Sequence, residues 1–228
     1  MSNTLGPTLC CLFIALSVTG LGVLAYLRKT SPQQRKMTWM RFFRRHNFRD
    51  TTEDPSLLKP YEDFEGCSGG TISRIVSGTY KGATIHLVEY HFQTDGAGSS
   101  RSVCIVEHAS LRLPHFRIRK QSSFLDAIGL GEVMNGQDIV FNDDKIFCER
   151  FVVQGEQEAI TRRFFNKSRR QFFCEHPLAY MALEGRGPAY VFHQHTNMTP
   201  RNVQSFLDLS TLWLGVLGEG SPDRPSRS

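Results

Sequence analysis

The longest apolar stretch of the chain covers residues 9–27, where no side chain carries a charge. A helix rises about 1.5 Å per residue, so these nineteen residues would span roughly 28 Å, close to the bilayer hydrocarbon core of about 30 Å. The eight residues ahead of it contain no Lys or Arg, whereas a cleaved secretory signal begins with a basic region. The pattern therefore predicts a retained transmembrane helix over residues 9–27, preceded by a short tail at residues 1–8.

Basic side chains flank only the C-terminal side of this stretch. Basic residues close to a span stay on the cytoplasmic side of the membrane. We therefore predict that the N-terminus lies outside and that the C-terminal domain is cytoplasmic. The cations that precede the first acidic residue, Asp50, are Arg28, Lys29, Arg35, Lys36, Arg41, Arg44, Arg45 and Arg49.

Within the basic segment, residues 36–46 interleave Met and aromatic side chains with cations. This mixture is typical of a helix that lies in the lipid headgroup region. It equally fits a first helix that packs on the following domain, and the sequence leaves both interpretations open. The predicted membrane-interface residues are Arg28, Lys29, Arg35, Lys36, Trp39, Arg41, Phe42, Phe43, Arg44 and Arg45.

Further along, apolar and polar residues alternate in short runs, which indicates strands. Two runs, 71–79 and 83–93, are separated by a turn signal at residues 80–82 and predict a hairpin. A Gly- and Ser-rich turn leads to a strand at 102–108, and a prolyl break precedes another at 116–119. These runs imply three or four antiparallel strands.

The period changes to that of a helix in the last third of the chain. From residue 156, Ile and Phe at helical spacings predict a helix that is broken near residues 166–168. The final helix has clear boundaries, because Thr199 can cap it with Pro200 in its first turn and Gly218 can end it. The other predicted elements are a helix at 122–133, strands at 138–141 and 147–153, and a second hairpin at 179–184 and 189–195.

Together these elements predict one α+β domain over residues 55–218, an antiparallel sheet packed by helices and ending in a C-terminal helix. The remaining length leaves room for a single domain, and 40% hydrophobic residues with 17 Phe indicate a packed core. A basic juxtamembrane segment at 28–54 precedes the domain. A polar tail rich in Pro and Ser follows at 219–228 and is predicted to be disordered.

The charge distribution and the span indicate the partners. The formal net charge of +5 is concentrated in the juxtamembrane segment, where anionic headgroups attract each cation by about 1 kcal/mol. We therefore predict membrane lipids as partners, with a second membrane or envelope protein as a further possibility, and no nucleic acid. A stripe of small residues in the span also predicts weak self-association: Cys11, Ala15, Thr19 and Gly22.

The most suggestive metal-binding pattern is the pair His193 and His195. Residues two apart on a strand project from one face, so both imidazoles can reach one ion. A third ligand would have to come from elsewhere in the chain; His86, His91 and His176 are candidates, and nothing in the sequence places them nearby. The alternative is that these are ordinary half-exposed strand histidines, and we predict no cofactor.

Six carboxylates between residues 138 and 158 invite an enzyme interpretation: Asp138, Asp143, Asp144, Glu149, Glu156 and Glu158. A loop explains the aspartates at 143 and 144, and the first turn of a helix explains the glutamates at 156 and 158. The sequence contains neither a G-x-S-x-G nor a Walker-type phosphate motif. We therefore assign no catalytic residue, and the missing motifs favour a protein that is not an enzyme over one with an unfamiliar active site.

Several short motifs are shared with known proteins, at residues 78–82, Tyr90, 113–119, 138–141, 147–158, Phe164, Phe165 and 190–192. In these motifs the chain resembles a family of uncharacterised bacterial proteins with a single N-terminal transmembrane helix and a soluble α+β domain. The resemblance implies the same architecture for this chain, and it implies no activity and no catalytic residue.

Two hypotheses for function follow from the sequence. The first is a single-pass membrane-anchored protein that acts as a binding or scaffolding module at the cytoplasmic face. The second is a membrane-tethered hydrolase or metal-dependent enzyme that uses His193, His195 and nearby acids. The tether and the basic segment favour the first.

Overall fold

A computed structural model describes residues 32–94, 97–121, 137–176 and 182–218. The chain divides into two compact units, Met1–Arg45 and His46–Ser228. Among the described residues, no helix combines the length and the apolar character that a membrane crossing requires. The span predicted at residues 9–27 lies outside the described residues, as do the helix predicted at 122–133 and the tail at 219–228.

The basic segment contains helix α2, Pro32–His46, which has no acidic residue in its first turn. The rings of Trp39, Phe42 and Phe43 contact one another, with centroids 5.6 to 6.3 Å apart. The helical interpretation of residues 36–46 is thus confirmed.

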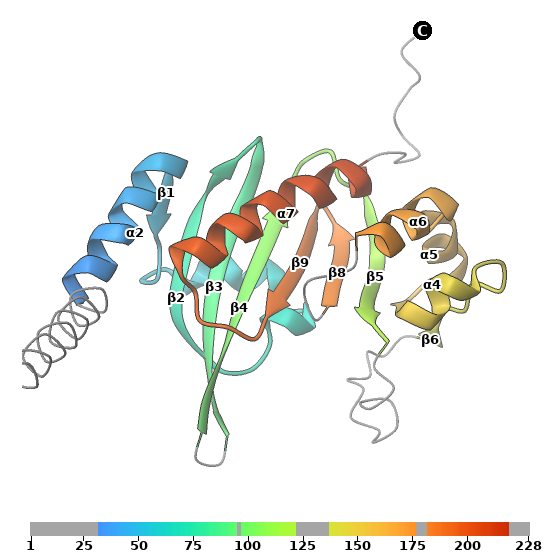
Figure 1. The fold of residues 1–228 in the computed structure, drawn as a ribbon, viewed down its shortest axis with the longest axis horizontal. Helices are drawn as coiled ribbons and strands as arrows, with labels where there is room; N and C mark the ends of the chain where they lie inside the picture. The colour runs from blue at the N-terminus through green and yellow to red at the C-terminus, as the bar shows by residue number, and fades with distance from the viewer. Residues whose placement is uncertain (1–31, 95–96, 122–136, 177–181, 219–228) are drawn as a thin grey trace, which may run out of the picture. The chain divides into compact units, whose positions relative to one another are not determined.

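The second unit is built on one antiparallel sheet with the strand order β1-β2-β3-β4-β9-β8-β5-β7-β6 (Figure 1). A two-residue turn joins β2 to β3, with Lys81 at φ 50° and Gly82 at φ 86°, as a tight hairpin turn requires. The strands are β1 Phe48–Asp50, β2 Thr71–Tyr80, β3 Ala83–Thr94, β4 Ala97–Glu107, β5 Leu113–Lys120, β6 Gln137–Asp138, β7 Phe151–Gly155, β8 Ala182–Gly187 and β9 Ala189–Gln194.

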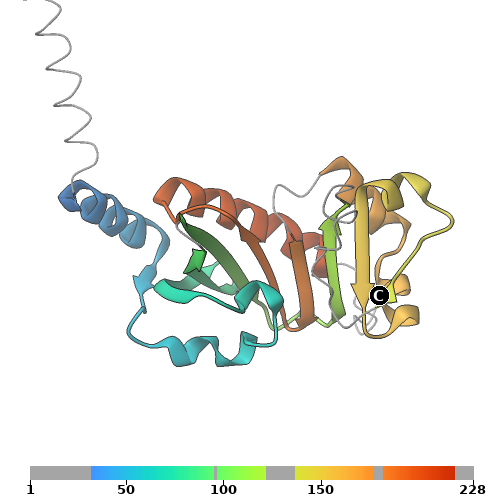
Figure 2. The same cartoon turned by 90° about the horizontal axis from the view of Figure 1, so that it is seen from below.

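Helix α7, Pro200–Gly218, covers one face of the sheet (Figures 1 and 2). Thr199 caps it, because its Oγ1 accepts a hydrogen bond from the Asn202 backbone N–H at 3.2 Å. Trp213 packs edge-on against Phe192 of β9, with ring centroids 4.7 Å apart. The predicted C-terminal helix and its boundaries are confirmed.

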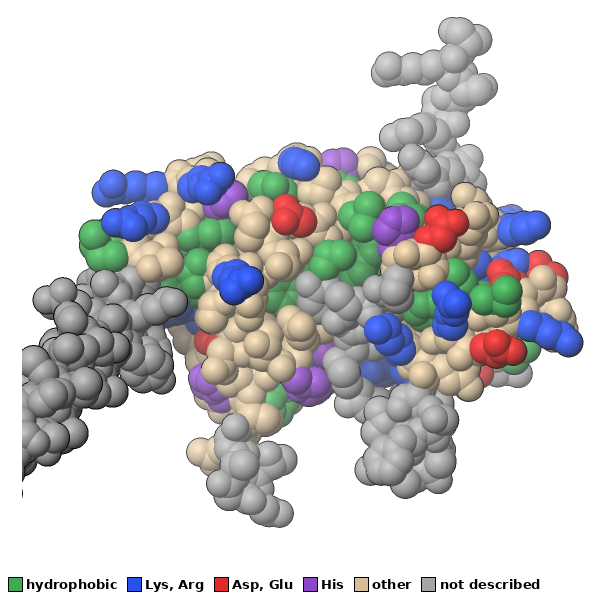
Figure 3. Space-filling model, viewed as in Figure 1, with side chains coloured by type: hydrophobic (Ala, Val, Ile, Leu, Met, Phe, Trp, Pro, Cys, Tyr) green, Lys and Arg blue, Asp and Glu red, His purple; other side chains and the backbone are tan. Residues whose placement is uncertain are grey.

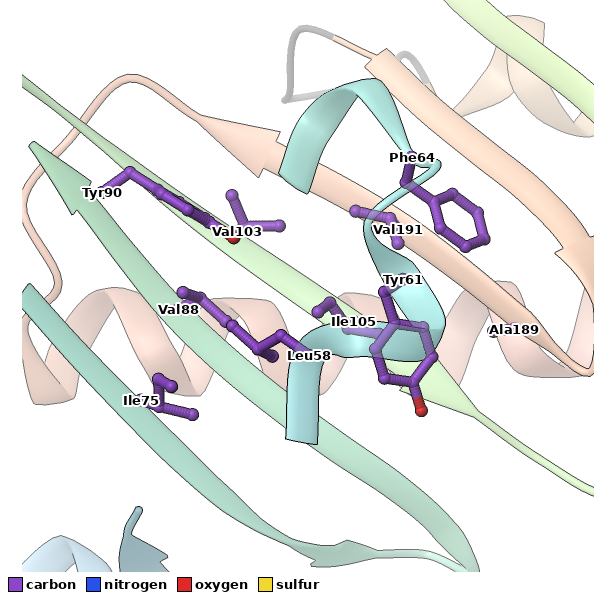
Figure 4. Packing of buried hydrophobic residues seen from close by; sticks show 10 residues of the cluster. All are labelled: Leu58, Tyr61, Phe64, Ile75, Val88, Tyr90, Val103, Ile105, Ala189 and Val191. Carbon is purple, nitrogen blue, oxygen red and sulfur yellow. The ribbon is translucent and has the colours of Figure 1, made fainter. Parts of the chain in front are cut away.

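The other face is covered by two 3-10 helices, η1 Pro55–Tyr61 and η2 Glu65–Cys67 (Figure 2). Leu58, Tyr61 and Phe64 of this segment pack on side chains from β2, β3, β4 and β9 (Figure 4). The buried cluster consists of Leu58, Tyr61, Phe64, Ile75, Val88, Tyr90, Val103, Ile105, Ala189 and Val191.

Three short helices pack at the β5, β7 and β6 end of the sheet: α4 Lys145–Arg150, α5 Glu158–Phe164 and α6 Lys167–Glu175. Asn166 accepts a hydrogen bond from the Arg169 N–H at 3.0 Å and starts α6, so the predicted break near residues 166–168 is confirmed. Arg169 then donates to the carbonyl oxygens of Val216 at 3.2 Å and Leu217 at 3.5 Å. These bonds supply partners for carbonyl groups in the last turn of α7, which have no partner within the helix.

The strand predicted at 147–153 is wrong in its first half. Asp144 caps a helical turn by accepting a hydrogen bond from the Phe147 N–H at 3.1 Å, and the strand begins only at Phe151. The ring of Phe147 lies 5.5 Å from that of Phe141 and 5.4 Å from that of Phe151. These contacts outweigh the strand preference of the local sequence.

The α+β class, the antiparallel sheet and both hairpins are as predicted, with differences at the boundaries. The sheet begins before the predicted domain start at residue 55, because β1 pairs with residues 76–78 of β2. The strand predicted at 138–141 is shorter, since β6 ends at Asp138. Of the described cysteines, all four are free thiols; Cys104 is buried, and the other three are half-buried.

Candidate functional site

Charged side chains gather on the sheet face that lies beneath η2. Strand register places Glu184 of β8 between Arg117 of β5 and Val191 of β9, on the face that carries the buried cluster. Arg117 and Glu184 are each 2% exposed, and His193 of β9 is 4% exposed. Charges so far from water require partners within the protein.

Backbone amides of η2 hold the carboxylate of Glu184. Its oxygens accept hydrogen bonds from the N–H of Glu65 at 2.8 Å and of Gly66 at 3.0 Å. The Arg117 guanidinium pairs with the carboxylate of Glu65. Burial raises the pKa of Glu184, and the amide hydrogen bonds and the Arg117 charge oppose that rise. The network ties η2 to β8 and β5.

Gly66 allows η2 to approach the sheet this closely. A Cβ atom at this position would lie 3.2 Å from both His193 Nδ1 and Val191 Cγ1, and 3.6 Å from Glu184 Oε1. A larger residue would push η2 away from β9 and weaken its bonds to Glu184.

The structure separates the environments of the predicted metal-binding pair. The rings of His193 and His195 lie 6.0 Å apart, but His193 is buried and His195 is exposed. His86 and His91 belong to β3, and His176 follows α6. Within the described residues, no group of three or more His, Cys, Asp or Glu side chains is placed to hold a metal ion.

A second polar group lies where the segment after β1 meets the first hairpin. Thr51 Oγ1 lies 2.8 Å from Ser77 Oγ, which lies 2.8 Å from His86 Nδ1. Burial lowers the pKa of His86, and the charge of Glu107 opposes this shift. The Tyr61 hydroxyl donates to the carboxylate of Glu107. These bonds fasten residue 51 and η1 to the sheet.

The six predicted carboxylates lie on separate elements. Asp143 and Asp144 pair with Arg170, at 2.6 and 3.0 Å, and Glu149 is exposed on α4. The other three have partners of their own: Asp138 with Gln154 at 2.8 Å, Glu156 with His115 at 2.7 Å, and Glu158 with Arg162 at 2.5 Å. The hydrogen bond with His115 lowers the pKa of Glu156.

Helix α2 carries the predicted membrane-interface residues from position 35 onward, whereas Arg28 and Lys29 lie outside the described residues. Met37, Met40, Arg41 and Arg44 follow the i, i+3, i+4, i+7 spacing of one helix stripe. Met37 is 53% and Met40 is 45% exposed. Figure 3 shows cations beside hydrophobic side chains on this helix.

Sequence reasoning missed the charged groups on the sheet, above all Arg101, Arg117 and Glu184. Both faces of β5 and β8 are buried in the middle of the sheet, so alternation along these strands does not mark the charges as buried: Phe116 and Ile118 would assign Arg117 to a polar face. The sequence does not show which group binds each charge: Glu184 accepts a hydrogen bond from the backbone N–H of Glu65, which lies 119 residues away in the chain.

The fold is similar to the crystal structure of the mycobacterial trehalose monomycolate transport factor A, TtfA. The TM-score is 0.56 at 13% sequence identity, and the match covers 79% of this chain and 93% of that chain. No family model and no curated protein matches the chain. The similarity therefore supports the fold, and the resemblance to a bacterial family with one N-terminal span stays a prediction.

Proposed function

We propose that this protein is a single-pass membrane-anchored binding module, with its sheet domain held at the cytoplasmic face and α2 lying in the headgroup region of an anionic bilayer. The observation that carries this proposal is the stripe on α2, where Met37 and Met40 stand beside Arg41 and Arg44 with no acidic residue in the helix. Thioether side chains can enter the acyl boundary while guanidinium groups bind phosphate oxygens.

The charge of the segment supports the same role. Each cation near an anionic surface contributes about 1 kcal/mol, so Arg41, Arg44 and Arg45 together give about 3 kcal/mol. This attraction falls with salt, because the Debye length is only about 8 Å at physiological ionic strength.

Binding also accounts for the domain better than catalysis does. The buried Glu184 and Arg117 are occupied by η2, and the acids near α4 and α5 pair with cations of the same domain. The fold occurs in a protein named for transport. We therefore propose that the domain of this chain binds a partner, such as a second envelope protein, and does not catalyse a reaction.

The two tryptophans of the chain allow a direct test. The full chain is reconstituted in anionic nanodiscs that contain brominated lipid, which quenches nearby indoles. With Trp213→Phe, the remaining Trp39 should be quenched, and Arg41→Glu with Arg44→Glu should reduce that quenching. With Trp39→Phe, the remaining Trp213 of α7 serves as the control. Both indoles are buried, at 8% exposed for Trp39 and 1% for Trp213, so a difference in quenching reports the distance of each from the lipid. An unquenched Trp39 contradicts the interfacial position of α2.

The orientation has its own test. A reporter that folds only outside the cytoplasm should be inactive when it is fused after Ser228. An active reporter would place the domain on the other side of the membrane and overturn the cytoplasmic assignment.

A further inference from the structure

Arg101 of β4 lies on the same sheet face as the buried cluster, directly across from Tyr90 of β3. Its guanidinium stacks on the ring of Phe92, 4.7 Å from the ring centroid. This cation–π contact fixes the plane of the guanidinium and leaves its edge of N–H donors directed away from the ring.

The guanidinium of Arg101 has no polar partner among the described residues. Its Nε atom is buried without a hydrogen bond, and none of the ion pairs of the described residues includes it. The other buried arginines are occupied: Arg117 pairs with Glu65, and Arg170 pairs with two aspartates. A half-buried cation with unused donors is costly unless an anion completes it.

The surroundings of Arg101 add a second donor and an apolar wall. The register Ser102↔Gln194 puts His195 across from Arg101, and the exposed imidazole of His195 can donate to the same ligand. The half-buried ring of Phe92 lies on the other side and packs on the buried ring of Tyr90, with centroids 6.5 Å apart. Phe92 is in turn close to the turn at Gly70, where a Cβ atom would lie 3.0 Å from Phe92 Cε1.

The nearby acids leave this position open to an anion. Glu184 and Arg101 both lie close enough to Cys67 for their charges to shift the pKa of its thiol, in opposite directions. The carboxylate of Glu184 is already bound by two backbone N–H groups of η2. The charge of Glu62 raises the pKa of Tyr90, and the side chain of Glu62 is exposed to water.

We propose that Arg101 and His195 form a binding site for a phosphate group, carried either by a lipid headgroup or by a small soluble molecule. An arginine fork binds two oxygens of an anion, as it does in a bidentate pair with a carboxylate. A phosphate offers a third oxygen to the imidazole. The half-buried ring of Phe92 offers an apolar surface to the group that the phosphate is attached to. This site belongs to the sheet unit and stands independently of where α2 lies.

The test uses the full chain in a non-ionic detergent, which itself carries no phosphate. Inorganic phosphate and dihexanoyl phosphatidic acid are titrated separately by isothermal titration calorimetry. Arg101→Gln should weaken binding by roughly 10- to 100-fold, as expected for loss of charge-assisted hydrogen bonds. Arg101→Lys keeps the positive charge but lacks the forked pair of N–H donors, so its affinity should lie between those of the wild type and Arg101→Gln. Arg163→Gln, which removes an exposed arginine of α5, is the matched control and should bind as the wild type does.

The two ligands separate the two sources of the phosphate. Binding of inorganic phosphate points to a soluble ligand, and binding of the phosphatidic acid alone points to a lipid headgroup; both support the site when Arg101→Gln weakens them. Unfolding midpoints of all variants establish that they are folded. Failure of both ligands to bind the wild type, or equal binding by Arg101→Gln and wild type, overturns the proposal.

Discussion

Replacing Gly185 with alanine tests the seam where β8 meets β5. Gly185 pairs with Phe116 across this seam and with Tyr190 on its other side. A Cβ atom at Gly185 would lie 2.3 Å from Phe116 Cε1, 2.7 Å from Phe116 Cζ and 3.1 Å from Leu113 Cδ1. The first two distances are far below van der Waals contact, so either Phe116 or a strand must move.

Phe116 has little room to move. It is fully buried, and its ring stacks on Phe164 at 5.2 Å and meets Phe165 edge-on at 5.0 Å. Overpacking costs about 1–3 kcal/mol, and a weakened aromatic pair costs a further 0.5–1.5 kcal/mol or so. We expect Gly185→Ala to destabilise the domain by about 2–4 kcal/mol. For a domain of this size, that lowers the midpoint by roughly 4 to 16 °C.

The assay is thermal unfolding of the full chain in non-ionic detergent, followed by Trp213 fluorescence in a Trp39→Phe background. Gly215→Ala is the matched control, because Gly215 lies in α7 with no atom within 4 Å of an added Cβ. Alanine is the better helix former by about 0.8–1 kcal/mol, so this variant should melt slightly higher than its parent. A Gly185→Ala variant that melts within about 1 °C of the parent would refute the packing of Phe116.

Two further substitutions test the polar groups. Arg170 is 5% exposed and donates hydrogen bonds to two aspartates and a backbone carbonyl. Arg170→Ala should therefore lower the free energy of unfolding, measured in urea, by about 2–4 kcal/mol. Substitution of the exposed Arg163 by alanine should change it by less than about 0.5 kcal/mol. Equal effects of the two would contradict the buried pairing. Burial lowers the pKa of His86, so the folded state favours the neutral imidazole. The stabilisation that His86 contributes is therefore fully present above the pKa of the unfolded state, near 6.5, and is lost as the pH falls below that value. His86→Asn, which keeps a partner for Ser77, should therefore be most destabilising at pH 7.5 and less so at pH 5, and a constant difference in melting temperature would argue against a buried neutral imidazole.

Local signals in the sequence predicted those elements that local contacts decide. Thr199 begins α7 through a hydrogen bond three residues away, and the turn at Lys81 and Gly82 sets the first hairpin. The same reasoning failed at residues 147–150, where strand-like composition competes with a helical turn. Asp144 and the rings of Phe141 and Phe147 decide that competition in favour of the turn.

The candidate site could not be predicted in this way, because its members meet only when distant strands pair. A strand alternates its side chains with a period of two, so the sequence alone shows which residues share a face of one strand. It does not show that β9 lies between β4 and β8, which brings His193 and His195 beside Arg101. The sequence by itself determined the class of the fold, the hairpins, the last helix and the basic amphipathic character of α2, all of which follow from spacing and caps. Only the tertiary structure decided that Glu184 and Arg117 are occupied and that Arg101 has unused donors, since burial and pairing depend on strand order and register across the sheet.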